Sequence, residues 1–292
     1  LLFSAISGYF ITKKAFKPIE KIRGAAEKIN EGNDLTQRIN IGEGNDEIYT
    51  LANTFDTMFD RLQDSFEREV QFNSDVSHEL RTPISVIMSQ SEYGKENVIS
   101  VEEGKNIFNI IFNEAQKMSQ LVSQLLTLSR MDRGHQKLNL ANVNISELAE
   151  IVIDSRREDA RRKNIDIFSK ITPDIYADVD EIMIMRVFIN LLSNAVTYGK
   201  INGNIYVDLD VQEKTIVIKI ADDGIGISDE HIDKIWTRFY QVDPSRNSEG
   251  AGLGLSMVKW IVEAHNGTIS VASKLGEGTI FTIKIPLKIV SL

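Results

Sequence analysis

The sequence predicts a multidomain chain in which two α-helical segments, each part of a four-helix bundle, precede an α+β sandwich. Apolar residues recur at steps of three and four as far as residue 133, which is the spacing of helices that pack along one seam. After a polar, linker-like stretch at 134–144, alternating apolar runs typical of strands are mixed with helical patterns. Helices mixed with a partly antiparallel sheet form an α+β layer structure.

The composition excludes several classes of protein. Of the 292 residues, 42% are hydrophobic and 26% are charged, as in a folded chain of two domains or one large domain. The net charge of -9 argues against a nucleic-acid partner, because binding phosphates requires a surplus of Lys and Arg. The absence of Cys excludes disulfides and a thiol nucleophile, and the four His residues lack the spacing of a metal pair on one helix face.

Residues 1–12 carry no charge and are followed by five basic residues between 13 and 23. Twelve residues are too few to cross a bilayer, which takes about 20. We expect them to be the end of a transmembrane helix whose basic flank marks the cytoplasmic side. The alternative is the apolar start of a helix that packs against a partner.

Residues 13–64 show two short helical seams joined by a polar, Gly-containing connector. Pro18 suits the start of the first helix, where its missing N–H costs nothing. The seams consist of Ile19, Ile22, Ala26 and Ile29, and of Ile48, Leu51, Phe55, Met58 and Leu62. Neither helix can bury its stripe alone, so we expect them to pair with each other and with a second copy as a parallel four-helix bundle. A simple helical hairpin is the alternative.

Residues 65–133 continue as two long helices. The second seam extends beyond Leu62 to about Gly94, and four-residue steps from 58 to 70 interrupt its heptad phase. A turn at 95–100 precedes a second apolar stripe between 101 and 133. Two long antiparallel helices form half of a four-helix bundle, so dimerisation is expected.

His78 lies in the helical segment Ser77–Pro83, about 100° away from the predicted seam, and should be exposed. A neutral imidazole is a nitrogen nucleophile, and the carboxylate of Glu79 can hold the opposite ring N–H. Thr82 lies one turn further along the same face, and Pro83 removes a backbone N–H from the helix. A merely solvated histidine is the alternative, and the Thr82 hydroxyl could equally bond back to the carbonyl of His78.

The last part of the chain combines helical and strand patterns. Helices are expected at 145–163, opened by Asn144 or Ser146, and at 180–198. Strands are expected around 205–211, 216–220, 269–271 and 281–285, with a Gly-Glu-Gly hairpin turn at 276–278.

Three segments of this part contain candidate ligand-binding residues. Asn190 and Asn194 share one helix face, and their amide oxygens are hard ligands that suit Mg²⁺. Asp222 follows a strand and could accept the exocyclic amine of a purine, beside glycines at 224 and 226 that allow close backbone approach. Segment 250–255 precedes a helix whose N–H groups could bind phosphates. The alternatives are surface asparagines and ordinary turns, and the sequence has neither a P-loop nor a G-x-G-x-x-G fingerprint.

Taken in order, these segments resemble the sensor histidine kinases of two-component signalling. The matching motifs are the H box at 72–83, the N box at 190–198, the G1 box at 222–227, the F box at 236–240, the G2 box at 250–255 and a Gly-rich turn at 276–279. By the same resemblance, residues 13–64 look like a HAMP linker domain, 65–133 like a dimerisation and histidine phosphotransfer domain, and 144–290 like a GHKL (Bergerat-type) catalytic ATP-binding domain.

The resemblance implies an ATP-dependent protein histidine kinase that phosphorylates His78 and passes the phosphoryl group to an aspartate of a response regulator receiver domain. Carried over to this sequence, Glu79 would orient His78, Arg238 would contact the γ-phosphate, and Thr82 would support a phosphatase activity toward the regulator. ATP and Mg²⁺ are the implied cofactors. The implied state is a homodimer anchored in the cell membrane, with this part of the chain mostly cytoplasmic.

The resemblance also assigns the nucleotide site, and it assigns Mg²⁺ to the two N-box asparagines. The residues that it places at the nucleotide are Asn190, Asn194, Tyr198, Asp222, Gly224, Gly226, Ile227, Phe239, Gly250, Gly252, Leu253, Gly254, Leu255 and Thr279.

Two residues depart from the family pattern. Thr197 stands where the N box usually has Lys, which removes a phosphate contact, and Asp223 replaces the common Asn. Lys200 or Arg246 could compensate. Two other hypotheses remain, namely an ATPase of the gyrase or chaperone type, which the His78 segment opposes, and a signalling scaffold with an inactive kinase domain, which Thr197 favours.

Overall fold

The computed structural model describes residues 47–97, 100–132, 138–242 and 251–287 and, before residue 47, residues 3, 6, 8, 9, 16, 19–21, 23, 24, 27, 36, 38 and 39. The chain divides into two compact units, residues 1–78 and 79–292. Pro18, Arg246 and Gly250 lie outside the described residues, as does most of the predicted transmembrane end at 1–12. No helix in the described part of the chain is both long and apolar enough to cross a membrane.

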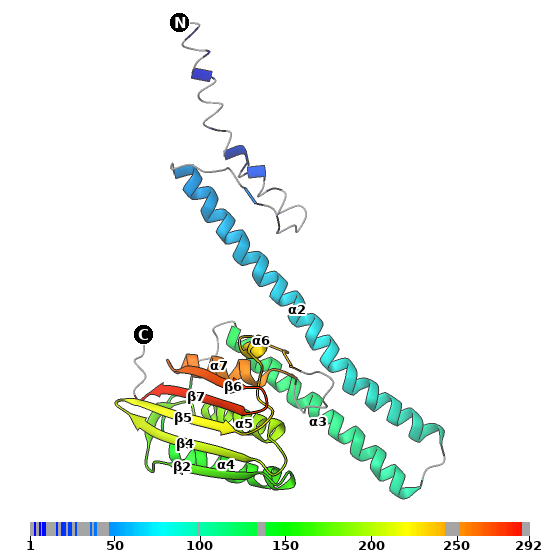
Figure 1. Ribbon diagram of the computed structural model, residues 1–292. Coiled ribbons are helices and arrows are strands. Elements are labelled where there is room, and N and C mark those ends of the chain that lie inside the picture. The colour runs from blue at the N-terminus through cyan, green and yellow to red at the C-terminus, as the bar shows by residue number, and fades with distance from the viewer. Residues whose placement is uncertain are drawn as a thin grey trace. The chain divides into compact units, whose positions relative to one another are not determined.

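Helix α2 runs from Glu47 to Glu96 as a single element (Figure 1). This confirms the prediction that the second seam continues beyond Leu62 to the neighbourhood of Gly94. The helix includes Pro83, whose ring is buried although it removes one backbone donor from the helix.

The connector before α2 packs on one face of that helix through Ile39. The Ile39 side chain is 5% exposed and forms a small apolar cluster with Ala52 and Phe59, against which Phe55 also packs. The connector therefore covers a face of α2 that lies next to the predicted seam. Three members of the seam stay about half exposed, namely Leu51, Met58 and Leu62.

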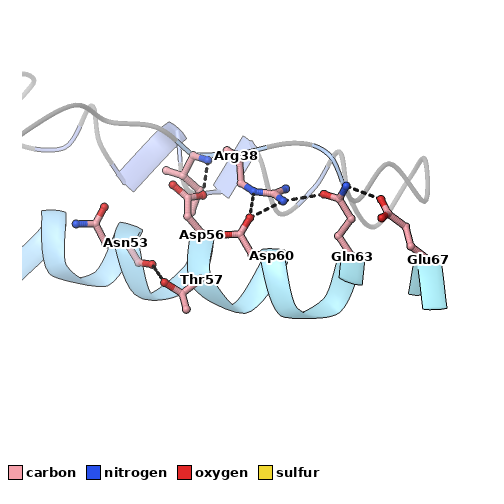
Figure 2. A network of polar contacts seen from close by, with 8 residues as sticks. Arg38, Asn53, Asp56, Thr57, Asp60, Gln63 and Glu67 are labelled. Atoms are coloured by element: carbon pink, nitrogen blue, oxygen red, sulfur yellow. Dashed lines mark hydrogen bonds and ion pairs between the residues drawn. The ribbon is translucent and has the colours of Figure 1, made fainter. Parts of the chain in front are cut away.

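Polar contacts fix the connector next to this apolar cluster (Figure 2). The Ile39 N–H donates to Asp56 Oδ1 at 2.8 Å. Arg38 donates from Nε to Asp60 Oδ1 at 2.8 Å and from Nη2 to Gln63 Oε1 at 2.7 Å. Successive acceptors lie about one turn apart on α2, so Arg38 and Ile39 together bind along about two turns of the helix.

Helix α3 runs from Val101 to Asp132 and follows α2 through a short turn. In this turn the Tyr93 hydroxyl donates to Glu103 Oε1, and the Glu103 N–H donates to the Ser100 hydroxyl. One face of α3 is buried, at Ile107, Leu121 and Leu128. A second apolar stripe is exposed and consists of Val101, Phe108, Phe112, Val122 and Leu126.

The C-terminal part forms the predicted α+β fold. Its elements in chain order are β1 Ala141–Asn144, α4 Ile145–Arg162, β2 Asp166–Ile171, β3 Tyr176–Val179, α5 Glu181–Tyr198, β4 Asn204–Gln212, β5 Thr215–Asp222, α6 Asp229–Ile232, a 3-10 turn Lys234–Trp236, α7 Gly254–Ala264, β6 Thr268–Lys274 and β7 Gly278–Pro286. Five strands form a sheet in the order β2-β4-β5-β7-β6, with β2 and β4 parallel and the other neighbours antiparallel. Strands β1 and β3 form a separate antiparallel pair.

Helices α4, α5 and α7 cover one face of the five-stranded sheet, and the core lies between them and the strands (Figure 1). Inward residues such as Ile205, Val207 and Ile218 are at most 1% exposed. On the opposite face Phe168 and Tyr206 are stacked and about half exposed. This alternation along the strands is what the period-two pattern predicts.

The sequence missed three strands. Residues 141–144 were expected to end a linker but form β1, which pairs only with the short strand β3 within the described residues. Strand β2 lies at a sheet edge and exposes the consecutive residues Phe168, Ser169 and Lys170, so its sequence does not alternate. The predicted helix start at Asn144 is confirmed, because its side chain accepts the Glu147 N–H.

Candidate functional site

The residues predicted to surround the phosphoacceptor lie in the middle of α2. His78 and Thr82 are exposed, as expected, and Glu79 is half-buried. The hydroxyls of Ser77 and Ser85 donate to the carbonyls four residues earlier. Within the described residues no such back-bond forms at Thr82, so the predicted alternative for its hydroxyl is not observed.

Asp222 ends strand β5 and points its carboxylate at backbone donors. Its Oδ1 accepts the Gly224 N–H at 2.9 Å, and the Thr279 N–H also donates to the carboxylate. Burial raises the pKa of the Asp222 carboxyl to about 6, although the two N–H groups act in the opposite direction. Asp222 is therefore an oriented carboxylate that ionises near neutral pH.

Ser273 on β6 joins the G1 segment to the β6–β7 hairpin. Its hydroxyl donates to the Gly278 carbonyl and accepts the Ile227 N–H, both at 2.8 Å. The Thr279 hydroxyl lies 2.8 Å from Ser273 Oγ. Because the single proton of Ser273 goes to Gly278, Thr279 is the donor in this contact. The network fixes Ile227 and Thr279 beside Asp222.

The backbone of the G1 segment approaches its neighbours so closely that side chains do not fit. A Cβ on Gly224 would lie 2.4 Å from the carbonyl oxygen of Tyr198, and Gly226 has a φ of +66°. The Ile225 N–H donates to the same Tyr198 carbonyl at 3.1 Å. Tyr198 thus holds the G1 segment through its backbone, and its side chain is 39% exposed.

The two N-box asparagines lie half-buried on one face of α5, as predicted. Asn190 Nδ2 donates to the Arg186 carbonyl at 2.8 Å, which leaves its amide oxygen as a free acceptor site. A Cβ on Gly254, the first residue of α7, would lie 2.7 Å from Asn190 Oδ1. The amide oxygen therefore lies beside the N-terminus of α7, where the N–H groups of a helix can bind an anion.

These residues fit the implied ligands. Mg²⁺ retains several waters and is usually held by one or two protein oxygens together with substrate phosphates, so two amide oxygens suffice. Among the residues that the structure describes, no group of three His, Cys, Asp or Glu side chains is placed to hold a metal ion. The Asp222 carboxylate is an acceptor of the kind that an adenine amine requires.

The F and G2 boxes meet through their backbones. The Phe239 N–H donates to the Gly252 carbonyl at 3.0 Å, and a Cβ on Gly252 would lie 2.6 Å from the Phe239 carbonyl carbon. Leu253 is 1% exposed, whereas Arg238 and Leu255 are half-buried. The structure thus brings all described members of the predicted nucleotide site onto one domain.

The residues that depart from the family pattern have contacts of their own. Asp223 accepts the Asn204 N–H and the Asn204 side-chain amide, so it anchors the start of β4. Lys200 donates to the Gly276 carbonyl at 2.8 Å. Lys163 donates to the carbonyl of Thr197 at the end of α5. The hairpin contact of Lys200 does not support its predicted compensating role at the phosphates.

Sequence reasoning missed Ser273 and His265. Ser273 could have been found from the hairpin turn, because pairing across that turn places it opposite Thr279. His265 is fully buried, and burial lowers its pKa, so the ring is neutral. Its Nε2 accepts the N–H of Asp180, the residue that caps α5, and its Nδ1–H donates to Ile261. His265 thus links α7 to the start of α5.

Three family descriptions match the chain. They are the HAMP domain at residues 10–64, the His Kinase A (phospho-acceptor) domain at 68–134, and the histidine kinase-, DNA gyrase B- and HSP90-like ATPase at 179–289. The chain belongs to the sensor histidine kinases of two-component systems. The HAMP and phospho-acceptor matches decide against the gyrase-type alternative.

Individual sensor histidine kinases are similar over nearly the whole chain. YclK of Bacillus subtilis is 31% identical over 98% of this chain and 62% of its own length, and BaeS of Escherichia coli is 29% identical over 98% and 61%. The chain thus spans about three fifths of the length of these relatives.

Solved structures of histidine kinases share the fold. Acinetobacter baumannii AdeS matches with a TM-score of 0.61 and 28% identity over 72% of this chain and 98% of its own. ThkA, solved in complex with the response regulator protein TrrA, matches with a TM-score of 0.62 and 25% identity over 77% of this chain and 64% of its own.

Proposed function

We propose that this chain transfers the γ-phosphoryl group of ATP to His78 and then to an aspartate of a response regulator receiver domain. The observation that supports this most directly is the preformed acceptor network around Asp222, in a chain whose phospho-acceptor domain exposes a helical histidine. The solved complex of ThkA with a response regulator supports a regulator as the partner of this chain as well.

The chemistry of His78 is nucleophilic. The unprotonated ring nitrogen attacks the γ-phosphorus, a P–N bond forms, and the P–O bond to ADP breaks. Glu79 holds the N–H of the other ring nitrogen and offsets the positive charge that develops on the ring. A carboxylate oxygen of the regulator then attacks the phosphorus, the P–N bond breaks, and His78 returns to its neutral form.

The nucleotide-binding residues position ATP for this transfer. Asp222 accepts the adenine amine, the N-terminus of α7 at Gly254 faces the phosphates, and Arg238 contacts the γ-phosphate. Asn190 and Asn194 would hold Mg²⁺, which when bound would neutralise part of the phosphate charge. Catalysis then rests on positioning and charge neutralisation rather than on a further covalent step.

We further propose that the chain acts as a homodimer. The exposed stripe on α3 and the half-exposed residues Leu51, Met58 and Leu62 on α2 are apolar surfaces, and a second copy would cover each of them in a separate four-helix bundle. Sedimentation of this chain at micromolar concentration tests the proposal, and a monomer at all concentrations would contradict it.

Incubation with γ-labelled ATP and Mg²⁺ tests the kinase proposal. We expect a protein-bound label that is lost in acid, as from phosphohistidine, and that is absent in His78→Gln. Because the nucleotide site lies on another domain, His78→Gln should bind ATP with the affinity of the wild type. An acid-labile label that persists in His78→Gln would refute the assignment of the acceptor.

A phosphatase activity toward the regulator is the second proposal, and it rests on Thr82. Its hydroxyl is exposed, lies one turn after His78 on the same face of α2, and has no back-bond within the described residues. Such a hydroxyl can both donate and accept, so it can hold a water in line for attack on an aspartyl phosphate.

A further inference from the structure

The F-box turn places a bulky residue in a backbone conformation that needs support. Phe239 has a φ of +60°, in the left-handed region that side chains disfavour. Strained conformations of this kind persist only where the surrounding contacts fix them. Arg238, the residue proposed to meet the γ-phosphate, immediately precedes this turn.

Among the contacts that anchor the segment containing the turn, three join it to other segments of the described part of the domain. At its start the Trp236 ring packs edge-on against Phe281 of β7, with ring centroids 6.1 Å apart. In its middle the Phe239 N–H donates to the Gly252 carbonyl. At its end the Tyr240 hydroxyl lies 2.5 Å from His231 Nδ1.

The contact between Tyr240 and His231 connects the F box with the helix that follows the G1 box. His231 lies on α6, which begins two residues after the G1 box, and its side chain is 23% exposed. Its Nε2 lies 3.5 Å from Glu230 Oε1. With the ring proton on Nε2 facing this carboxylate, Nδ1 is free to accept the Tyr240 O–H. The arrangement therefore satisfies the donors and acceptors of both side chains.

We infer that His231 and Tyr240 form a positioning pair that holds the Phe239 turn and thereby aims Arg238 at the γ-phosphate. The inference rests on the proposed role of Arg238 and adds two residues to the reaction, neither of which touches the substrate. Since an error of about 1 Å in a catalytic group can cost about 100-fold in rate, loss of one anchor should lower turnover without weakening nucleotide binding.

The kinetic test compares variants of this pair in autophosphorylation. Tyr240→Phe and His231→Leu should each lower kcat about tenfold with KM for ATP unchanged, and the double variant should be no slower than either one. His231→Gln should retain most of the rate, because its amide oxygen can accept the same O–H. Tyr206→Phe, on the open face of the sheet, is the matched control and should keep the rate of the wild type.

A second background separates positioning from a general structural effect. In Arg238→Ala, Tyr240→Phe should cause no further loss, because the tyrosine acts through that arginine. Wild-type kcat in Tyr240→Phe, or an equal loss in the Arg238→Ala background, would overturn the inference. A wild-type chain that binds ATP but forms no phosphohistidine would instead contradict the proposed kinase function.

Hydrogen exchange provides a readout that does not depend on activity. The Phe239 amide should exchange faster in Tyr240→Phe and in His231→Leu than in the wild type, and should be unchanged in Tyr206→Phe. Equal exchange in all four proteins would show that the pair does not hold the turn and would overturn the inference.

Discussion

The proposed adenine end of the nucleotide site and the proposed phosphoacceptor turn of α2 hold their polar groups in opposite ways. At the adenine end, Asp222, Ser273 and Thr279 are half-buried or buried and bond to backbone or to one another. On α2, His78 and Thr82 are exposed, and the Thr82 hydroxyl bonds to nothing among the described residues.

This difference separates a preorganised site from one that a ligand must complete. A network fixed by its own domain needs no reorganisation when the nucleotide arrives, so its residues should control affinity. Exposed groups on a helix acquire their geometry only when another molecule or domain docks on them. Substitutions there should change turnover and leave nucleotide affinity alone.

The largest effect is expected at Asp222. Asp222→Ala removes a charged, oriented acceptor, and we expect ATP affinity to fall about 100-fold or more, measured by calorimetry. Asp222→Asn, which keeps the size of the side chain, serves as the control for folding by circular dichroism. If Asp222→Ala binds ATP as tightly as His78→Gln does, the contrast between the two regions fails.

Thr82→Ala should produce the reverse pattern. We expect dephosphorylation of the regulator to slow about tenfold or more, with autophosphorylation and ATP affinity unchanged, because the hydroxyl is proposed to position only a water. Thr82→Ser keeps a hydroxyl and should retain most of the activity. Dephosphorylation by Thr82→Ala at the rate of the wild type would leave Thr82 without a role in catalysis.

Acid should weaken nucleotide binding at the preorganised site. The pKa of the Asp222 carboxyl is about 6 before the nucleotide binds. The carboxylate that is proposed to accept the amine is therefore present above pH 6 and is lost as the pH falls, so affinity should drop about tenfold per pH unit below 6. Adenosine is the preferred probe, since it has no phosphate to titrate. An equal pH dependence in Asp222→Asn would show that another group titrates.

The smallest effect is expected in the connector, where burial and polar contacts can be compared directly. Ile39→Ala removes a buried side chain and should lower the free energy of unfolding by about 2 kcal/mol or more, measured with urea. Arg38→Gln breaks the hydrogen bonds of the Arg38 side chain. It should nevertheless lower the free energy of unfolding by at most about 1 kcal/mol, because the side chain of its partner Asp60 is 62% exposed. A larger loss for Arg38→Gln would show that the polar contacts dominate.

The sequence predicted the elements whose pattern is set by burial on one face. Helices α4 and α5 and the alternating strands β4, β5 and β7 agree with their expected positions because each packs on the same core. Strands β1 and β2 were missed because their burial does not alternate regularly, and β3 was missed although it alternates, because it is only four residues long.

The candidate site was predictable as a set of motifs but not as a network. Ordered spacing identified Asp222 at the end of a recognisable strand, and Asn190 and Asn194 on one face of a recognisable helix. The contact of Tyr240 with His231 joins residues nine positions apart in the sequence and depends on the turn at Phe239. No local sequence pattern therefore predicts it. Asp223 departs from the family pattern at a position expected in the nucleotide site, but its carboxylate accepts a hydrogen bond from Asn204.

The hydrogen bonds of the Ser273 hydroxyl determine which neighbouring groups donate and which accept. Since Ser273 donates to Gly278 and accepts from Ile227, its remaining lone pair takes the proton of Thr279. The Thr279 oxygen can then only accept further hydrogen bonds, as can the ionised carboxylate of Asp222 next to it. A purine edge that binds between them, as proposed, would have to donate hydrogen bonds to both oxygens, so one serine on the neighbouring strand sets the hydrogen-bond polarity of the proposed site.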